Sequence, residues 1–276
     1  MPAQKPADVL ATCIGGVDDP ELQHRLQGIT PLLVAAATAY DQLARDQSLH
    51  QVVRAPNVGA VSRVELEALY TKHMSGPNGA ARLIYNALRN ASPHGKCPLC
   101  GVGTVTVLDH HLPKAHYPAL SVCPFNLVPA CDFCNNAKRA RFPTCAEEQT
   151  LHPYYDDYTQ QQWIFAELDN AGPPVLVFRV DAPAHWTQVE RLRAKRHFDV
   201  VKLGVSYTSN ANDDLIPLRT HLAAIANAKG ADGVQAYLAE EQARYAVRLN
   251  SWQHVMFQTL AASPWFIGGG FLQIPH

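Results

Sequence analysis

Two cysteine pairs enclose the stretch CPLCGVGTVTVLDHHLPKAHYPALSVCPFNLVPACDFC, residues 97–134. Each pair has the spacing C-x-x-C, which lets both sulfurs of the pair reach one ion. Four thiolates complete a tetrahedral zinc site and leave no coordination position for a substrate, so the predicted zinc is structural. The predicted ligands are Cys97, Cys100, Cys131 and Cys134.

Residues suited to phosphodiester chemistry lie within and just after this stretch. In LDHHLPK, residues 108–114, Asp109 is a hard oxygen ligand suited to Mg²⁺, and a neighbouring histidine could serve as a general base. Asn135, Lys138 and Arg139 are spaced i, i+3 and i+4 on the helix expected after the second cysteine pair. One face of that helix therefore presents an amide oxygen and two cations.

These motifs resemble the HNH endonucleases, the ββα-metal nucleases, in their four-cysteine zinc-bearing form. The family pattern is D-H-x-x-P, then N, then C-x-x-C-N-x-x-K. The resemblance covers residues 92–146 and implies catalysis by a divalent metal, Mg²⁺ or Mn²⁺. The implied roles are metal ligation by Asp109 and Asn135, general base for His110, loop bracing for Asn126, and phosphate binding by Lys138 and Arg139.

The position of a proline distinguishes the two adjacent histidines. D-H-x-x-P fits His110 with Pro113, whereas the same spacing from His111 would need proline where Lys114 stands. We therefore expect His110 to be the base and His111 to be a structural neighbour. Successive residues of a regular strand face opposite sides. Asp109 and His110 can thus share one metal only if the chain bends there.

The resemblance implies hydrolysis of phosphodiester bonds in DNA, most simply double-stranded DNA. A helical body around a small HNH core is similar to nucleases of bacterial anti-phage systems, Septu-like ones included, which implies an ATPase partner. A stand-alone restriction or mobile-element nuclease is the runner-up. The alternative from another class is a catalytically silent zinc module that binds nucleic acid or a protein.

The composition of the chain excludes few of these functions. The formal net charge is −1, so nucleic-acid binding must rest on local charge. Residues 92–142 contain five lysines and arginines against two acids, a local charge of +3. No apolar run is long enough to span a membrane, and the N-terminus lacks the pattern of a secretory signal. Paired cysteines suit a reducing compartment, so we expect a cytoplasmic protein.

The periodicity predicts a mostly helical α+β protein, and the resemblance implies a small ββα zinc-bearing core inserted between the helical segments. The expected regions are residues 1–91, helical; 92–146, the HNH core; and 147–276, short strands followed by helices. Residues 1–27 read as an irregular lead, and Pro31 is placed near the start of the first helix. The expected helices are 30–48, 63–74, 78–91, 131–141, 184–203, 214–228, 231–249 and 251–262, and the expected strands are 104–108, 163–168 and 175–180.

Two further segments allow alternative readings. The basic run 191–197 could contact a DNA backbone, although a solvated helix face is the simpler reading. The loop HPYYDDY, residues 152–158, could contact substrate, or its tyrosines could anchor it to the body.

Overall fold

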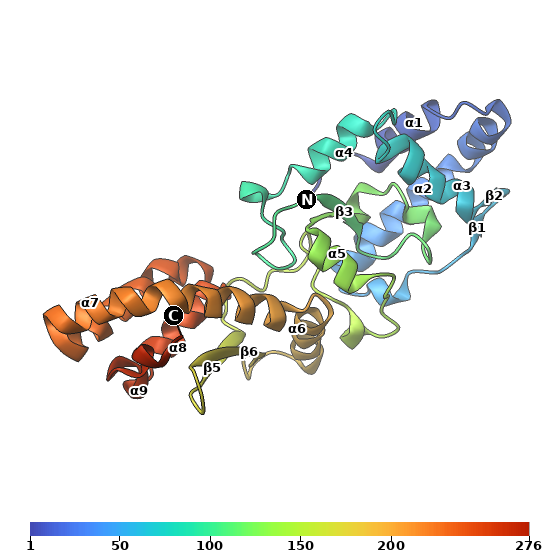
Figure 1. The fold of residues 1–276 in the computed structure, drawn as a ribbon. Coiled ribbons are helices and arrows are strands. Elements are labelled where there is room, and N and C mark those ends of the chain that lie inside the picture. The colour runs from blue at the N-terminus through green and yellow to red at the C-terminus, as the bar shows by residue number, and fades with distance from the viewer. Residues whose placement is uncertain (276) are drawn as a thin grey trace. The chain divides into compact units, whose positions relative to one another are not determined.

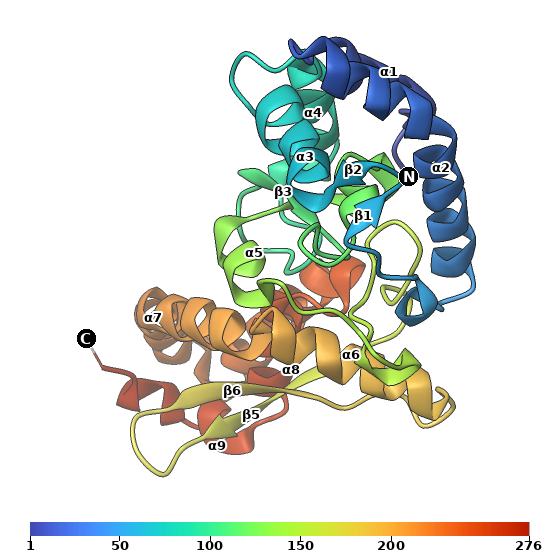
Figure 2. The same ribbon diagram turned by 90° about the vertical axis from the view of Figure 1, so that its right-hand side faces the viewer.

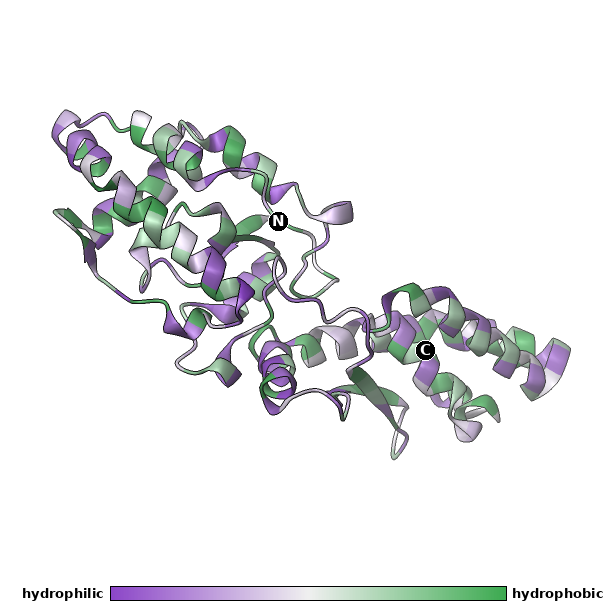
Figure 3. Cartoon of the chain, turned by 180° about the vertical axis from the view of Figure 1, so that it is seen from behind, coloured by the Kyte–Doolittle hydropathy of each residue, from purple (hydrophilic) through white to green (hydrophobic). Residues whose placement is uncertain are grey.

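The computed structural model describes residues 1–275 and divides into two units, Met1–Asp156 and a second that begins at Asp157. Both units consist largely of helices, with two short antiparallel strand pairs described in the first unit and one in the second, so the predicted mostly helical α+β class is confirmed (Figure 1). In Figure 3, hydrophobic and hydrophilic residues alternate along most helices, as expected of helices with one buried face. Among the described residues, no helix combines the length and apolar character needed to cross a membrane.

The first unit begins with two helices that start earlier in the chain than the sequence predicts. The predicted irregular lead is wrong, because α1 (Pro6–Gly15) and α2 (Pro20–Arg45) occupy it. The Asp19 carboxylate accepts hydrogen bonds from the backbone N–H of Glu21 and of Leu22, and Pro20 provides a first helical residue. Pro31, expected near a helix start, lies inside α2 on its exposed side.

Further short elements complete the first unit. The predicted helix at 63–74 is confirmed as α3 continued by the π-helical segment η2, and that at 78–91 is confirmed in a shorter form as α4. The bounds are η1 (Leu49–Gln51), β1 (Asn57–Val58), β2 (Val61–Ser62), α3 (Arg63–Ala68), η2 (Leu69–Met74), α4 (Arg82–Arg89), η3 (Pro93–Gly95), β3 (Val107–His110), η4 (Pro118–Leu120), η5 (Pro124–Asn126), β4 (Leu127–Ala130), α5 (Asp132–Lys138) and η6 (Ala146–Glu148).

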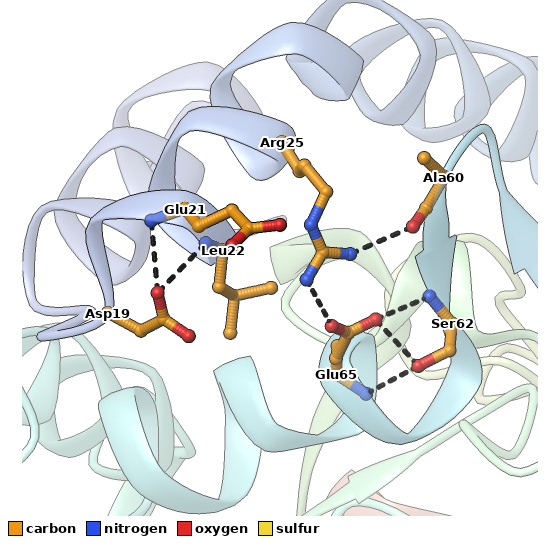
Figure 4. A network of polar contacts seen from close by, with 7 residues as sticks. All are labelled: Asp19, Glu21, Leu22, Arg25, Ala60, Ser62 and Glu65. Carbon is orange, nitrogen blue, oxygen red and sulfur yellow. Dashed lines mark hydrogen bonds and ion pairs between the residues drawn. The ribbon is translucent and has the colours of Figure 1, made fainter.

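A polar network joins α2 to the start of α3 (Figure 4). The Arg25 guanidinium donates to a Glu65 carboxylate oxygen at 2.6 Å and to the Ala60 carbonyl at 2.8 Å. The second Glu65 oxygen accepts from the backbone N–H and the hydroxyl of Ser62, which caps α3. Ser62 and Glu65 thus form a capping box, and the two bonds of Arg25 hold the β1–β2 turn and the start of α3 against α2.

Two apolar clusters place the β3–β4 pair on the N-terminal helices. The first packs side chains of α1, α2, α3, η2 and α4 against Leu108 and Leu127. The second packs the C-terminal half of α2 against Leu112 and Leu120, which lie in the loops between the two strands. The ββα element therefore shares its core with the helices that precede it. The predicted boundary at residue 91 falls inside this unit.

In the second unit, both strands and most helices lie where the sequence predicted them. Strands β5 (Ile164–Asp169) and β6 (Val175–Val180) pair antiparallel, as the alternation at 163–168 and 175–180 predicted. The helical bounds are α6 (Gln188–Val200), α7 (Leu203–Tyr245), η7 (Ala246–Arg248), α8 (Trp252–Ala261), α9 (Pro264–Ile267) and η8 (Gly270–Gln273). The predicted break between helices 214–228 and 231–249 is confirmed by Gly230 within α7, whose φ is +66°. The first of these helices begins earlier than expected, at Leu203.

Candidate metal centre and ββα site

The two C-x-x-C pairs form one buried cluster of four sulfurs. All four Sγ atoms lie within 4.8 Å of one another, and those of Cys100 and Cys131 are 3.9 Å apart. Tetrahedral zinc with Zn–S bonds of about 2.3 Å needs sulfurs roughly 3.8 Å apart, so the cluster could hold a metal ion such as zinc. The four cysteines that the sequence predicts as ligands therefore do lie together, and zinc binding by them stays a prediction. The cluster comprises Cys97, Cys100, Cys131 and Cys134.

Tight backbone turns bring the sulfurs together. The Cys97 carbonyl accepts from the N–H of Cys100 and of Gly101, and Gly101 has a φ of +70°. The Gly103 N–H donates to the Cys100 sulfur at 3.3 Å. A Cβ at Gly103 would lie 2.6 Å from the Cys131 sulfur, so only glycine fits there. The second pair opens α5, with Cys131 as its N-cap residue.

Strands β3 and β4 and helix α5 follow one another around this cluster. In the antiparallel register, Asp109 lies opposite Val128 and His110 opposite Leu127. Figure 2 shows α5 beside β3 in the first unit. The strand predicted at 104–108 begins three residues later, at Val107, and extends two residues further, because its pairing with β4 runs through His110. The helix predicted at 131–141 ends at Lys138, since Arg139 takes a positive φ of 53°.

Asp109 is buried against α5 and carries a cation partner. Lys138 Nζ lies 3.2 Å and 3.0 Å from the two carboxylate oxygens and donates to the His110 carbonyl at 2.6 Å. The two side chains are 7% and 4% exposed. Burial raises the pKa of Asp109, and the attraction of the Lys138 ammonium opposes that rise. Lys138, predicted to bind phosphate, thus lies inside the unit with Asp109 as its partner.

His110 lies on the other side of the strand. Its Nε2 is 2.8 Å from the Ser121 carbonyl, and its ring meets the Tyr70 ring edge-on at 4.4 Å. A carbonyl only accepts hydrogen bonds, so Nε2 carries the proton and Nδ1 is the acceptor of the neutral ring. Burial lowers the pKa of His110 to about 3. Because β3 extends through His110, the strand alternation gives Asp109 and His110 different neighbours.

Asn126 joins the two sides of the loop between the strands. Its fully buried side chain accepts from the Leu112 N–H at 2.7 Å and donates to the carbonyls of Leu112 and Leu120. Its own carbonyl accepts from the His111 N–H. These bonds hold the chain that follows His110. Asn135 is half-buried one turn before Lys138, and within the described residues its side-chain amide makes no hydrogen bond.

The loop HPYYDDY packs against this element through its tyrosines and its histidine. Tyr154 donates to the Leu127 carbonyl at 2.8 Å, and Tyr155 donates to the Asp41 carboxylate at 2.7 Å. The His152 ring lies 4.1 Å from that of His111. The anchoring alternative for this loop is therefore the one that the structure supports.

Sequence reasoning missed two groups that contact His110. Neither the Tyr70 ring nor the Ser121 carbonyl belongs to a recognisable motif. A tyrosine in a helical segment reads as a core residue, and a backbone carbonyl can be supplied by any residue. No signal in the sequence could have singled them out.

Fold and site together define a class, a mostly helical α+β protein in which four clustered cysteines hold a ββα element. The chain belongs to the family of protein ea31 of Escherichia phage lambda. It is 32% identical to that protein over 227 residues, which cover 77% of this chain and 76% of the phage protein. No protein-family model matches the chain, so the resemblance to HNH endonucleases stays a prediction. No solved structure matches it either.

Proposed function

We propose that this chain is a metal-dependent endonuclease of the HNH type that hydrolyses phosphodiester bonds in DNA. The observation that carries the proposal is the β3–β4–α5 arrangement, which the four cysteines clip together. At the end of β3, Asp109 lies against α5, and His110 lies on the other side of the strand, against the loop that Asn126 braces. A zinc clip alone requires none of these three residues.

The environment of Asp109 fits a cation. Its carboxylate is buried and balanced by the Lys138 ammonium, so this position already holds one positive charge. Carboxylate and amide oxygens are the ligands that Mg²⁺ prefers, and Asn135 on α5 offers an amide oxygen one turn before Lys138. When bound, Mg²⁺ or Mn²⁺ supplies neutralisation of the charge that develops on the phosphate.

The remaining chemistry belongs to the His110 ring. Its Nε2 proton is directed at the Ser121 carbonyl, which fixes the tautomer and leaves Nδ1 to accept a proton from water. Asn126 holds the backbone that follows His110, so it acts on the reaction through the position of that ring.

Two observations favour a second candidate, a catalytically silent zinc module that binds nucleic acid or a protein. His110 is buried with Nε2 on a carbonyl, and Asp109 is paired with Lys138. Both interactions are stable without a divalent metal. The nuclease therefore requires the Asp109 carboxylate to accept a metal in addition to, or in place of, the ammonium.

Cleavage of a supercoiled plasmid separates the two candidates. We expect nicking with added Mg²⁺ or Mn²⁺ and none without them, while zinc content measured on the same samples stays constant. His110→Ala should reduce the rate by at least about 10²-fold, the contribution typical of a general base. His24→Ala, which removes an exposed histidine from α2, should cut as the unmodified protein does. Full activity of His110→Ala would refute the role of His110, and inactivity of the unmodified protein would favour the silent module.

The phage relative bears on the biological setting. A family member in phage lambda favours a nuclease of a mobile element over one of a host defence system. The anti-phage role and its ATPase partner stay predictions. Co-purification of the protein with the products of its neighbouring genes tests them.

A further inference from the structure

Phe142 connects three segments of the first unit at its surface. The Arg54 guanidinium lies over its ring, 4.6 Å from the centroid. The rings of His116 and Tyr117 contact it at centroid distances of 4.6 Å and 6.2 Å. Phe142 therefore fixes the chain after α5 to the loop after His110 and to the segment around Arg54.

The same segments carry basic side chains toward solvent. Arg54, Arg139 and Arg141 are exposed, and Lys114 and His116 are half-exposed. In the described part of the chain, none of these five forms an ion pair with a carboxylate. The charges of Arg54, Lys114, Arg139 and Arg141 are therefore available to an anionic ligand.

The two segments nearest Phe142 continue directly from the candidate catalytic elements. Residues 111–117 follow His110 at the end of β3, and residues 139–142 follow Lys138 at the end of α5. The contact between His116 and Phe142 brings these continuations together. A polyanion held by them would pass beside the end of β3.

Arg139 supplies an independent observation. Its backbone has φ 53° and ψ −143°, a conformation that favours glycine, yet the position carries an exposed arginine. Residues in such sparsely populated conformations are enriched at functional sites. Here the conformation of Arg139 ends α5, and the exposed guanidinium lies at the point where the helix ends.

We propose that Arg54, Lys114, His116, Arg139 and Arg141, which lie on the three segments that meet at Phe142, form a binding surface for the phosphodiester backbone of a nucleic acid. We call it the Phe142 surface. It goes beyond the proposed nuclease activity but rests on it for its biological role, since it would hold the backbone beside Asp109 and His110. Fixed cations on neighbouring segments suit the regular charges of a backbone, and such contacts do not depend on sequence.

Binding without cleavage tests the surface separately from the nuclease. In the His110→Ala background and without divalent metal, fluorescence anisotropy measures affinity for labelled duplex DNA, single-stranded DNA and RNA across a range of salt concentrations. We expect Arg54→Gln and Arg141→Gln each to weaken binding several-fold. Each should also lower the slope of log K against log salt by about 0.9 on duplex DNA for every lost phosphate contact. The control Lys72→Gln removes an exposed lysine from η2 and should change neither quantity.

Arg139→Gly gives a readout that loss of folding cannot mimic. Glycine relieves the backbone strain, so this variant should have a higher melting temperature and nevertheless bind more weakly. The three nucleic acids identify which backbone the surface prefers.

The outcomes separate the two proposals. Unchanged affinity and salt slope in Arg54→Gln and Arg141→Gln, an equal loss in Lys72→Gln, or binding to none of the three ligands would overturn the surface. Weakened binding in the two variants, together with an unmodified protein that cuts nothing, would support the surface and refute the nuclease. Cleavage that depends on His110, with normal binding in all variants, would support the nuclease and refute the surface.

Discussion

At the scale of single residues, Lys138 shows what helical spacing can and cannot predict. The spacing correctly predicts Asn135 and Lys138 on one short helix, but it is wrong for Arg139, which lies just beyond the end of α5 in a non-helical conformation. Spacing does not show whether a face meets solvent or another strand. Lysine is rarely buried unless paired, and the partner, Asp109, lies 29 residues earlier in the chain. Only the antiparallel register of β3 and β4 brings that carboxylate to α5.

The buried ion pair predicts strongly coupled effects on stability. Lys138→Met leaves the Asp109 carboxylate buried without a counter-charge, so we expect the free energy of unfolding to fall by about 3–5 kcal/mol. The double variant Asp109→Asn with Lys138→Met removes both charges and should recover most of that loss. Urea unfolding of zinc-loaded protein measures both values, with Lys72→Met as an exposed control. Equal destabilisation by the single and double variants would show that the Lys138 ammonium does not offset the cost of burying the Asp109 carboxylate.

At the scale of elements, the sequence predicts those boundaries that neighbouring residues determine. The break of α7 at Gly230 and the turn that joins β5 to β6 are both predicted, because each is determined by residues close in the chain. The capping signal of Asp19 and Pro20 is equally local, and it, rather than Pro31, marks the start of α2. The end of β3 depends on its pairing with β4, which no local pattern specifies. The candidate site follows this division, since its motif residues could be predicted and its contacts with Tyr70 and Ser121 could not.

The cysteine cluster depends on a glycine that is not a ligand. Gly103→Ala places a methyl group 2.6 Å from the Cys131 sulfur, so the sulfurs must move apart. We expect zinc affinity, measured by competition with a chromophoric chelator, to fall at least about tenfold, in the range seen when groups supporting metal ligands are changed. Gly172→Ala is the matched control, because a Cβ there has open space and the glycine does not need a positive φ. Zinc affinity equal to that of the unmodified protein in Gly103→Ala would contradict this account of the cluster.

The network between α2 and α3 predicts a pH dependence. Hydrogen bonds from Arg25, and then from Ser62, lower the pKa of Glu65 from 4.5 to about 2. A depressed carboxyl pKa stabilises the folded protein above the unfolded value, and this contribution is lost as the pH falls from 4.5 towards 2. Arg25→Gln should therefore destabilise at pH 7 by about 1 kcal/mol or less, since the pair is partly solvent-exposed.

Urea unfolding at several pH values measures this difference between Arg25→Gln and the unmodified protein. The difference should shrink as the pH falls below 4.5, because Glu65 then becomes protonated in both proteins. Zinc release in acid affects both alike and cancels. Arg63→Gln, which removes the exposed pair with Glu67, is the control. A difference that is constant with pH would mean that Arg25 acts through packing rather than through the charge of Glu65.

At the scale of the whole molecule, the candidate site belongs to one unit. The four cysteines, Asp109, His110 and the Phe142 surface all lie before Asp157. Both apolar clusters of that unit draw on α2, and each also includes side chains of the β3–β4 region. The ββα element follows the helices along the chain as predicted. In space, however, it is not a separate core, because it shares both apolar clusters with those helices.

This shared core predicts which fragment folds. A chain of residues 1–156 contains both clusters and the complete cysteine site, so we expect it to bind zinc stoichiometrically and to unfold cooperatively. A chain of residues 92–156 keeps every cysteine ligand and every motif residue but lacks α1 to α4, which cover Leu108 and Leu127. It should therefore show few amides protected from hydrogen exchange, even with zinc present, because exposed apolar surface leaves the strand pair without a core. Mass spectrometry of exchange in β3 and β4 compares the two fragments. Equal protection in both would show that the cysteine cluster alone specifies the ββα element, and aggregation of the longer fragment would show that its core requires the second unit.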